Sequence, residues 1–175
     1  MAATTPVHAA AARSIKSAVA DSPTTIGILS DTHGLVRPEV EKALTGCHQI
    51  LHAGDVGDGQ VLKRLERIAP VMAVRGNMDH GSWSNPLPIR EMVEIEGIFF
   101  YILHDLDHLD VDPSAAGIHV VVSGHTHQPK IFQKNGVIYL NPGSAGQRRF
   151  NYPVSVAMVR IENGNLIPRI IEIDR

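Results

Sequence analysis

Acidic and imidazole side chains follow directly after apolar runs along this chain. The first run, residues 25–30, leads into Asp31 and His33. An uninterrupted apolar run is typical of a strand buried on both faces, and ligands collect at the carboxyl ends of such strands in α/β proteins. A carboxylate oxygen and an imidazole nitrogen at this spacing suit a divalent first-row metal. Taken alone, such a pair is more often an Asp that caps a turn beside an exposed His.

The same arrangement returns after four later apolar runs. These positions hold, in order, Asp55, Asn77, His104 and the pair His125 and His127. Two divalent ions held about 3.5–4 Å apart need about seven protein donors, with one carboxylate shared between them. Asp55 stands in the middle of the series and is the natural bridging group. A glycine directly precedes or follows each of these positions except His104, at Gly34, Gly54, Gly76 and Gly124. Glycine lets the backbone turn sharply, so that the side chains can converge.

The elements that must position these residues follow an α/β rhythm. Strands are expected at 26–30, 49–53 and 70–74, with helices at 38–44 and 58–68 between them. This order predicts a parallel sheet with right-handed crossovers. Later segments predict a buried strand at 119–123 and three hairpins, formed by 90–95 with 97–103, 131–134 with 137–140 around Asn135-Gly136, and 154–161 with 166–173. Pro168 lacks a backbone N–H, which places the last strand at a sheet edge.

Length and composition indicate one globular domain at 25–175, preceded by a tail at 1–24. The tail is rich in Ala, Ser and Thr, and its residues 9–19 have the propensity for a marginal helix. The net charge of −2 carries no strong nucleic-acid signal, and no apolar run is long enough to span a membrane. The single cysteine, Cys47, excludes an internal disulfide and favours a cytoplasmic location.

As an ordered set, the motifs closely resemble the calcineurin-like metallophosphoesterase superfamily. The resemblance covers residue 25 to the C-terminus and, through the Asn141-Pro142-Gly143-Ser144 element and the terminal hairpin, points to the small YfcE-like phosphodiesterase branch. It implies an α/β fold in which a two-sheet β-sandwich is flanked by helices, in four layers (αββα). The motifs are Asp31-Thr32-His33, Gly54-Asp55-Val56-Gly57-Asp58, Gly76-Asn77-Met78-Asp79, His104 and Gly124-His125-Thr126-His127.

The resemblance also implies roles for individual residues. One metal would be held by Asp31, His33, Asp55 and His127, and the other by Asp55, Asn77, His104 and His125. A hydroxide that bridges the two ions would attack a phosphodiester in line with the leaving oxygen. Mn²⁺ is the expected cofactor, with Ni²⁺, Fe²⁺, Co²⁺, Zn²⁺ and Mg²⁺ as alternatives, because mixed nitrogen and oxygen sites accept several metals.

The chain departs from the family pattern at two places. Many family phosphatases have a leaving-group histidine where this chain has Met78, which cannot carry a proton, so diesters or good leaving groups are the expected substrates. Asp79 and His80 are candidate replacement proton donors. Asp105-Leu106 stands where the branch usually has Gly-His, which changes the expected substrate contacts.

Other polar residues have less specific signals. Asn77 suits binding of both metal and phosphate, while Arg148 and Arg149 are candidates to contact substrate phosphate or form a solvated pair. Asp58 is either a helix N-cap or an orienting residue. His48, His52, His108 and His119 read as packed or surface residues, and His52, three residues before Asp55, is also a candidate to support that ligand.

Two classes of function follow from these residues. The first is a metal-dependent phosphodiesterase or phosphatase that acts on a small-molecule phosphate ester. The alternative is a non-catalytic, metal-binding interaction scaffold of the same fold, as in the retromer subunit. The complete set of seven ligands favours the enzyme, and the sequence is compatible with a monomer or a homo-oligomer.

Overall fold

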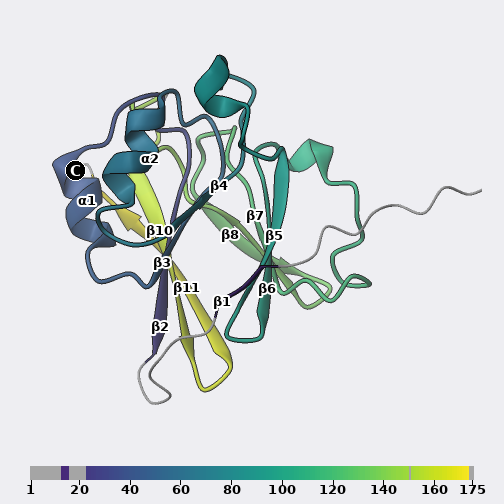
Figure 1. The fold of residues 1–175 in the computed structure, drawn as a ribbon. Coiled ribbons are helices and arrows are strands. Elements are labelled where there is room, and N and C mark those ends of the chain that lie inside the picture. The colour runs from purple at the N-terminus through teal and green to yellow at the C-terminus, as the bar shows by residue number, and fades with distance from the viewer. Residues whose placement is uncertain (1–12, 16–22, 150, 174–175) are drawn as a thin grey trace, which may run out of the picture.

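Two β-sheets pack face to face in the computed structural model, which describes residues 13–15, 23–149 and 151–173. The six-stranded sheet has the order β1-β5-β6-β7-β9-β8, and the five-stranded sheet has the order β11-β10-β2-β3-β4 (Figure 1). The strands are β1 Arg13–Ile15, β2 Thr24–Leu29, β3 Gln49–His52, β4 Val71–Ala73, β5 Arg90–Ile95, β6 Ile98–Leu103, β7 Val120–Val122, β8 Lys130–Lys134, β9 Val137–Asn141, β10 Ser155–Glu162 and β11 Asn165–Glu172.

The centre of each sheet is parallel and its hairpins lie toward the edges, as predicted. Strands β2, β3 and β4 run parallel in one sheet, and β6, β7 and β9 run parallel in the other. The edge strand β11 carries Pro168, opposite Val159 of β10. Because the carboxyl ends of parallel strands meet at one edge of a sheet, the segments after these strands can build a shared site.

Two short α-helices make the predicted crossovers and cover the outer face of the five-stranded sheet. Helix α1 (Pro38–Leu44) begins at Pro38, whose missing N–H is not needed in a first turn. Helix α2 (Gly59–Leu65) is shorter than the predicted 58–68, because residues 66–68 continue as turns. Asp58 is its N-cap and accepts a hydrogen bond from the Gln60 N–H at 2.8 Å.

The main core lies between the sheets. Ile28 and Leu51 from one sheet and Phe100 and Val122 from the other belong to a single buried cluster. Full burial of such a side chain contributes about 1.5–3 kcal/mol relative to exposure. A second cluster lies under the helices and includes Leu44 of α1. The sheets are therefore held in a fixed relation beneath the edge that carries the polar residues.

The outer side of the six-stranded sheet is covered by the segment 104–119 and not by an α-helix. Its regular part is the short 3-10 helix η2 (Leu106–His108), and Leu106 and Leu109 pack against the apolar face of β6 and β7. A second 3-10 helix, η1 (Ser82–Ser84), follows β4. The predicted two-sheet sandwich is confirmed, with this loop as its fourth layer.

One expectation for the N-terminal tail is wrong. Residues 13–15 form strand β1, which pairs in parallel with β5, where a marginal helix had been predicted over 9–19. Pairing with an existing strand edge supplies backbone hydrogen bonds that an isolated short helix lacks. The rest of that predicted helix lies outside the described residues. No helix in the described part of the chain is long and apolar enough to cross a membrane.

Candidate metal centre

All seven predicted metal ligands gather at one edge of the sandwich, in the segments that follow β2, β3, β4, β6 and β7. The segments after β2 and β3 remain paired beyond the strands. The Asp31 N–H donates to the Gly54 carbonyl and the His33 N–H to the Asp55 carbonyl, both at 3.0 Å. These bonds hold the two loops side by side and bring their ligands to the same place.

Five of the ligands have a left-handed backbone conformation. Their φ angles lie between 47° and 67°, at Asp31, His33, Asp55, His125 and His127. A non-glycine residue in this region costs about 1–2 kcal/mol, and such residues cluster at functional sites. The other positive-φ residues that are not glycine, Glu96, Asn135 and Asn163, lie in the hairpin turns. At this edge the positive φ angles of His33 and His125 belong to tight turns, closed by the Leu35 N–H on the Thr32 carbonyl and by the Thr126 N–H on the Gly124 carbonyl, and these turns direct the side chains toward the centre.

The first half of the centre contains Asp31, His33 and His127. The Nε2 atoms of His33 and His127 lie 3.4 Å apart, and Asp31 Oδ1 lies 3.2 Å from His127 Nε2. Two ligands about 2.1 Å from a common ion lie about 3.0–3.4 Å from each other. Asp31 Oδ1 is also buried and has no hydrogen-bond partner among the described residues. An unsatisfied buried carboxylate oxygen beside two imidazole nitrogens fits a divalent cation.

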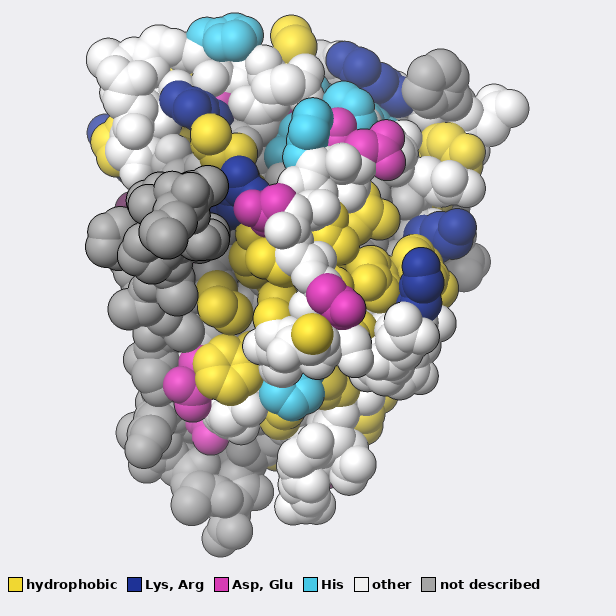
Figure 2. Space-filling view, turned by 90° about the vertical axis from the view of Figure 1, so that its right-hand side faces the viewer, with side chains coloured by type: hydrophobic (Ala, Val, Ile, Leu, Met, Phe, Trp, Pro, Cys, Tyr) yellow, Lys and Arg dark blue, Asp and Glu magenta, His cyan; other side chains and the backbone are white. Residues whose placement is uncertain are grey.

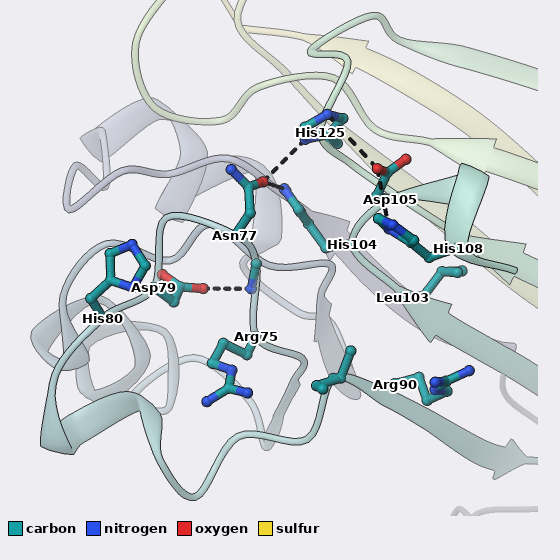
Figure 3. A pocket seen from close by; sticks show the side chains of 12 residues that line it. Arg75, Asn77, Asp79, His80, Arg90, Leu103, His104, Asp105, His108 and His125 are labelled. Carbon is teal, nitrogen blue, oxygen red and sulfur yellow. Dashed lines mark hydrogen bonds and ion pairs between the residues drawn. The ribbon is translucent and has the colours of Figure 1, made fainter.

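The second half contains Asn77, His104 and His125 (Figure 3). Asn77 Oδ1 lies 3.0 Å from His104 Nε2 and 3.2 Å from His125 Nδ1. Asp55 Oδ2 lies 3.4 Å from His104 Nε2 in this half and 4.0 Å from His33 Nε2 in the other half. One oxygen of Asp55 thus faces both groups, which is the arrangement that a bridging carboxylate requires.

Protein contacts occupy the outward-facing atoms of Asp31, Asp55 and His104, whereas the buried Nδ1 of His127 has no hydrogen-bond partner among the described residues. Asp31 Oδ2 accepts hydrogen bonds from the Ser30 hydroxyl and the His125 N–H, and Asp55 Oδ1 accepts one from the Met78 N–H. His104 Nδ1 lies 2.8 Å from the Ala53 carbonyl, so this nitrogen carries the hydrogen. Each of these ligands is oriented from behind, with its remaining donor atom directed at the centre.

The surroundings shift the pKa values of His33, Asp55 and His104 in different directions. Burial lowers the pKa of His33, with His127 and Arg149 acting in the same direction against the nearby carboxylates. Burial acts to raise the pKa of Asp55, but hydrogen bonds from His104 and the Met78 N–H outweigh it and the net shift is downward. Burial opposes charge on His104, yet Asp55 and Asp31 raise its pKa overall. The lowered pKa of Asp55 favours its ionised form, which is the form that binds a cation.

His52 supports the loops and is not a ligand. The ring is fully buried, and its Nδ1 accepts from the Gly54 N–H at 3.2 Å while Nε2 lies 2.9 Å from the Thr32 hydroxyl. Burial lowers the pKa of this imidazole to about 4. The interpretation of His52 as a packed, supporting residue agrees with this geometry.

The predicted proton donors lie in different settings. Asp79 is buried, and its two oxygens accept hydrogen bonds from the Gly57 N–H at 2.7 Å and the Gly76 N–H at 2.8 Å. This geometry favours a bracing role for Asp79 over proton donation. His80 is exposed and lines a cavity beside the centre. The predicted substrate residues Arg148 and Arg149 are both exposed, and Arg149 is close enough to His33 to act on its charge.

Sequence reasoning did not assign Arg75 to the site, and it singled out Asp105 only as a departure from the family pattern that changes the expected substrate contacts. Arg75 lines the cavity, as does Asp105, whose Oδ2 lies 3.3 Å from His108 Nδ1 and 3.9 Å from His125 Nε2. Arg75 directly precedes the Gly76-Asn77 motif and Asp105 directly follows His104, and that adjacency was the available signal. Figure 2 shows histidine and acidic side chains gathered at the upper edge of this face, above an area of hydrophobic side chains.

Comparisons with known proteins agree with this geometry. Residues 25–164 match the calcineurin-like phosphoesterase superfamily domain. A probable metallophosphoesterase of Methanothermobacter thermautotrophicus is 37% identical over 158 residues, covering 83% of this chain and 91% of the relative. A phosphodiesterase of Methanocaldococcus jannaschii is 30% identical over 138 residues, covering 67% of this chain and 82% of the relative.

Solved structures share the fold at lower identity. Vacuolar protein sorting 29 from Cryptosporidium parvum superposes with a TM-score of 0.69 at 19% identity, covering 89% of this chain and all of the other. The E. coli phosphoesterase YfcE superposes with a TM-score of 0.63 at 24% identity, covering 86% of this chain and all of the other. At these identities the likeness concerns the fold alone.

Proposed function

The chain belongs to the calcineurin-like phosphoesterase superfamily, and from this premise we propose that it is a phosphodiesterase that works with two divalent metal ions. The observation that carries the proposal is the convergence of seven donor residues at one edge, with Asp55 Oδ2 facing both groups. The similarity to a phosphodiesterase of 30% identity supports the reaction class.

The two halves of the centre would each hold one ion. Asp31, His33, Asp55 and His127 would hold one ion, and Asp55, Asn77, His104 and His125 the other. When bound, two such ions acidify water and neutralise the charge of phosphoryl oxygens. Mn²⁺ is the ion that we propose, although the donor set also suits Ni²⁺, Fe²⁺, Co²⁺, Zn²⁺ and Mg²⁺.

The protein itself orients the ester and limits which leaving groups it accepts. The side-chain amide of Asn77 has N–H donors besides the oxygen that faces His104 and His125, and these N–H groups suit a phosphoryl oxygen. Met78 is 54% exposed at the position where a proton donor would assist departure, and its thioether carries no proton. We therefore propose that the substrates are diesters or esters with good leaving groups, with His80 as the nearby imidazole that can still donate a proton.

The single cysteine bears on the cellular location that we propose for the enzyme. Cys47 is buried, and burial raises the pKa of its thiol to about 11, so this thiol is unreactive. We propose the cytoplasm as the location, because the chain needs no oxidising compartment. We also propose that the substrate is a small-molecule phosphate ester.

A non-catalytic scaffold is the rival function, supported by the fold shared with vacuolar protein sorting 29. That likeness says nothing of activity at 19% identity. The filled ligand set favours catalysis, because a scaffold does not require seven converging donors with strained backbones. The two functions make opposite predictions for turnover.

Hydrolysis of bis-p-nitrophenyl phosphate and of p-nitrophenyl phosphate by chelator-stripped protein, with Mn²⁺ restored, tests the proposal. We expect metal-dependent release of p-nitrophenolate, faster from the diester than from the monoester. Replacing Asp55→Ala should lower kcat/KM at least about 100-fold, because it removes a ligand shared by both halves. Glu172→Ala, which removes an exposed carboxylate from β11, is the matched control and should retain activity.

Circular dichroism of both variants distinguishes loss of the site from loss of the fold. If none of Mn²⁺, Ni²⁺, Co²⁺, Zn²⁺ or Mg²⁺ restores cleavage although ions are bound, the enzyme proposal fails and the scaffold becomes the better account.

A further inference from the structure

A cavity of about 700 Å³ opens directly beside the second half of the metal centre. Its wall includes Asn77, His104 and His125 at one end, and continues to Arg75 and Arg90 (Figure 3). Ile89 and Leu103 give part of the wall an apolar surface. A single phosphate group needs only a small part of this volume, so the cavity has room for one organic substituent of a phosphate ester.

The two arginines of this cavity differ in their partners. Arg90 forms an ion pair with Asp110, which also accepts a hydrogen bond from the Tyr101 hydroxyl at 2.8 Å. Arg75 is a half-buried residue, and its guanidinium has no hydrogen-bond or ion-pair partner among the described residues. A planar guanidinium without a partner in a concave site suits a carboxylate or a phosphate, which it can bind through two parallel hydrogen bonds.

The acidic residues of the wall, Asp79 and Asp105, form no ion pair with Arg75. Both oxygens of Asp79 accept backbone N–H groups, and the Asp105 carboxylate faces His108 and His125. In Figure 3 the Asp105 carboxylate lies beside His125 and His108, while the Arg75 guanidinium lies on the side away from Asn77 and His125. The charge of Arg75 is therefore left for a ligand.

The backbone of Arg75 is tied to the metal centre. The Arg75 N–H donates to the Pro88 carbonyl at 2.8 Å, and Asp79 holds the N–H of the next residue, Gly76. A Cβ at Gly76 would collide with the Asp55 backbone nitrogen and Oδ1, so the two loops are in direct contact. The distance from Arg75 to the centre is thus set by the packed loops, as recognition of two groups on one molecule requires.

We propose that this cavity binds one ester substituent of the substrate and that Arg75 recognises a second anionic group, a carboxylate or a phosphate, on that substituent. The inference rests on the proposed function, because the metal centre is taken to bind the reacting phosphoryl group. It names the substrate class as phosphodiesters whose organic part carries a further negative charge.

Binding of phosphonates to the full-length, Mn²⁺-loaded protein tests the inference without turnover, because phosphonates lack the ester bond. Three series of alkylphosphonates of increasing chain length, ending in a methyl, a carboxylate or a second phosphonate, are titrated by calorimetry with protein-free blanks. At the best length, an anionic end group should tighten binding to the wild type about tenfold or more over the methyl end group. Whether carboxylate or phosphonate gains more identifies the group that Arg75 selects.

Two arginine variants complete the measurement. Arg75→Gln should bring the affinity ratio between anionic and methyl probes close to one. Arg169→Gln removes an exposed arginine of β11 that does not line the cavity and should keep the wild-type ratio. Equal affinity of all end groups for the wild type, or an unchanged ratio in Arg75→Gln, overturns the inference.

The diester assay distinguishes this failure from failure of the proposed function. If the protein hydrolyses bis-p-nitrophenyl phosphate but binds all end groups equally, the Arg75 inference fails and the proposed phosphodiesterase activity is supported. If Arg75 is needed for a preference for anionic end groups but no diester is hydrolysed, the anion site at Arg75 is supported and the proposed enzymatic function fails.

Discussion

At the scale of single residues, the polar atoms of the predicted metal ligands fall into two sets. The outward atoms of Asp31, Asp55 and His104 bond to the protein, and the inward atoms face one another at 3.2–4.0 Å. Without a cation the inward oxygens lack adequate partners, and the buried Asp31 Oδ1 is the clearest case. These residues therefore fit metal ions both because of their types and because their inward oxygens lack hydrogen-bond partners.

The buried imidazole of His52 makes a prediction about stability and pH. Burial lowers the pKa of His52 to about 4 in the folded protein, compared with 6.5 for an ordinary imidazole. The unfolded chain therefore takes up a proton as the pH falls below 6.5, while the folded chain does so only near pH 4. The free energy of unfolding of the metal-free protein should fall across this window by up to about 3 kcal/mol from this residue.

Urea unfolding of wild type and His52→Gln at a series of pH values isolates this contribution. The variant lacks the titrating ring, so its stability should decline less steeply between pH 6.5 and 4. Parallel pH dependences of the two proteins would show that His52 does not carry the effect.

At the scale of elements, the loops after β3 and β4 approach each other more closely than side chains allow. Gly76 lies against the Asp55 backbone and carboxylate, and Gly124, which follows β7, lies against the Ser30 side chain. These contacts explain why glycine stands beside the ligands in the sequence. At Gly76 and Gly124 the reason is close packing between loops, since neither has a positive φ angle.

Gly76→Ala should therefore weaken the metal centre. The added methyl group must displace the Asp55 carboxylate or its backbone, so we expect affinity for Mn²⁺ to fall about tenfold or more. Gly59→Ala is the matched control, because a Cβ there meets only Trp83 at 3.5 Å and the residue begins α2. Calorimetric Mn²⁺ titrations compare the two, and an unchanged affinity in Gly76→Ala would refute the packing argument.

At the scale of the whole molecule, the order of the elements was largely predictable and their stacking was not. The alternation of apolar runs and amphipathic helices predicts the parallel strands, and Asn135-Gly136 adopts the two positive φ angles that its predicted turn requires. No local pattern, however, places His104 and His125 of one sheet against Asp55 and Asn77 of the other. That juxtaposition came from the family resemblance.

The features that sequence reasoning missed depend on contacts between distant segments. Strand β1 forms because β5 offers it an unpaired edge, which no property of residues 13–15 reveals. Arg75 matters because segments from β4, β5 and β6 enclose one cavity, and because its neighbour Arg90 is already paired with Asp110. Both features arise from tertiary packing, which overrides local propensity.

We propose that one chain holds two metal ions that share Asp55. The most direct test is a Mn²⁺ titration of the metal-free protein, read by calorimetry for stoichiometry and by electron paramagnetic resonance for coupling between neighbouring ions. We expect two ions per chain with the spectrum of a coupled pair, as for ions about 3.5–4 Å apart, and loss of that spectrum in Asp55→Ala. A single bound ion, or two ions with uncoupled spectra, would contradict it.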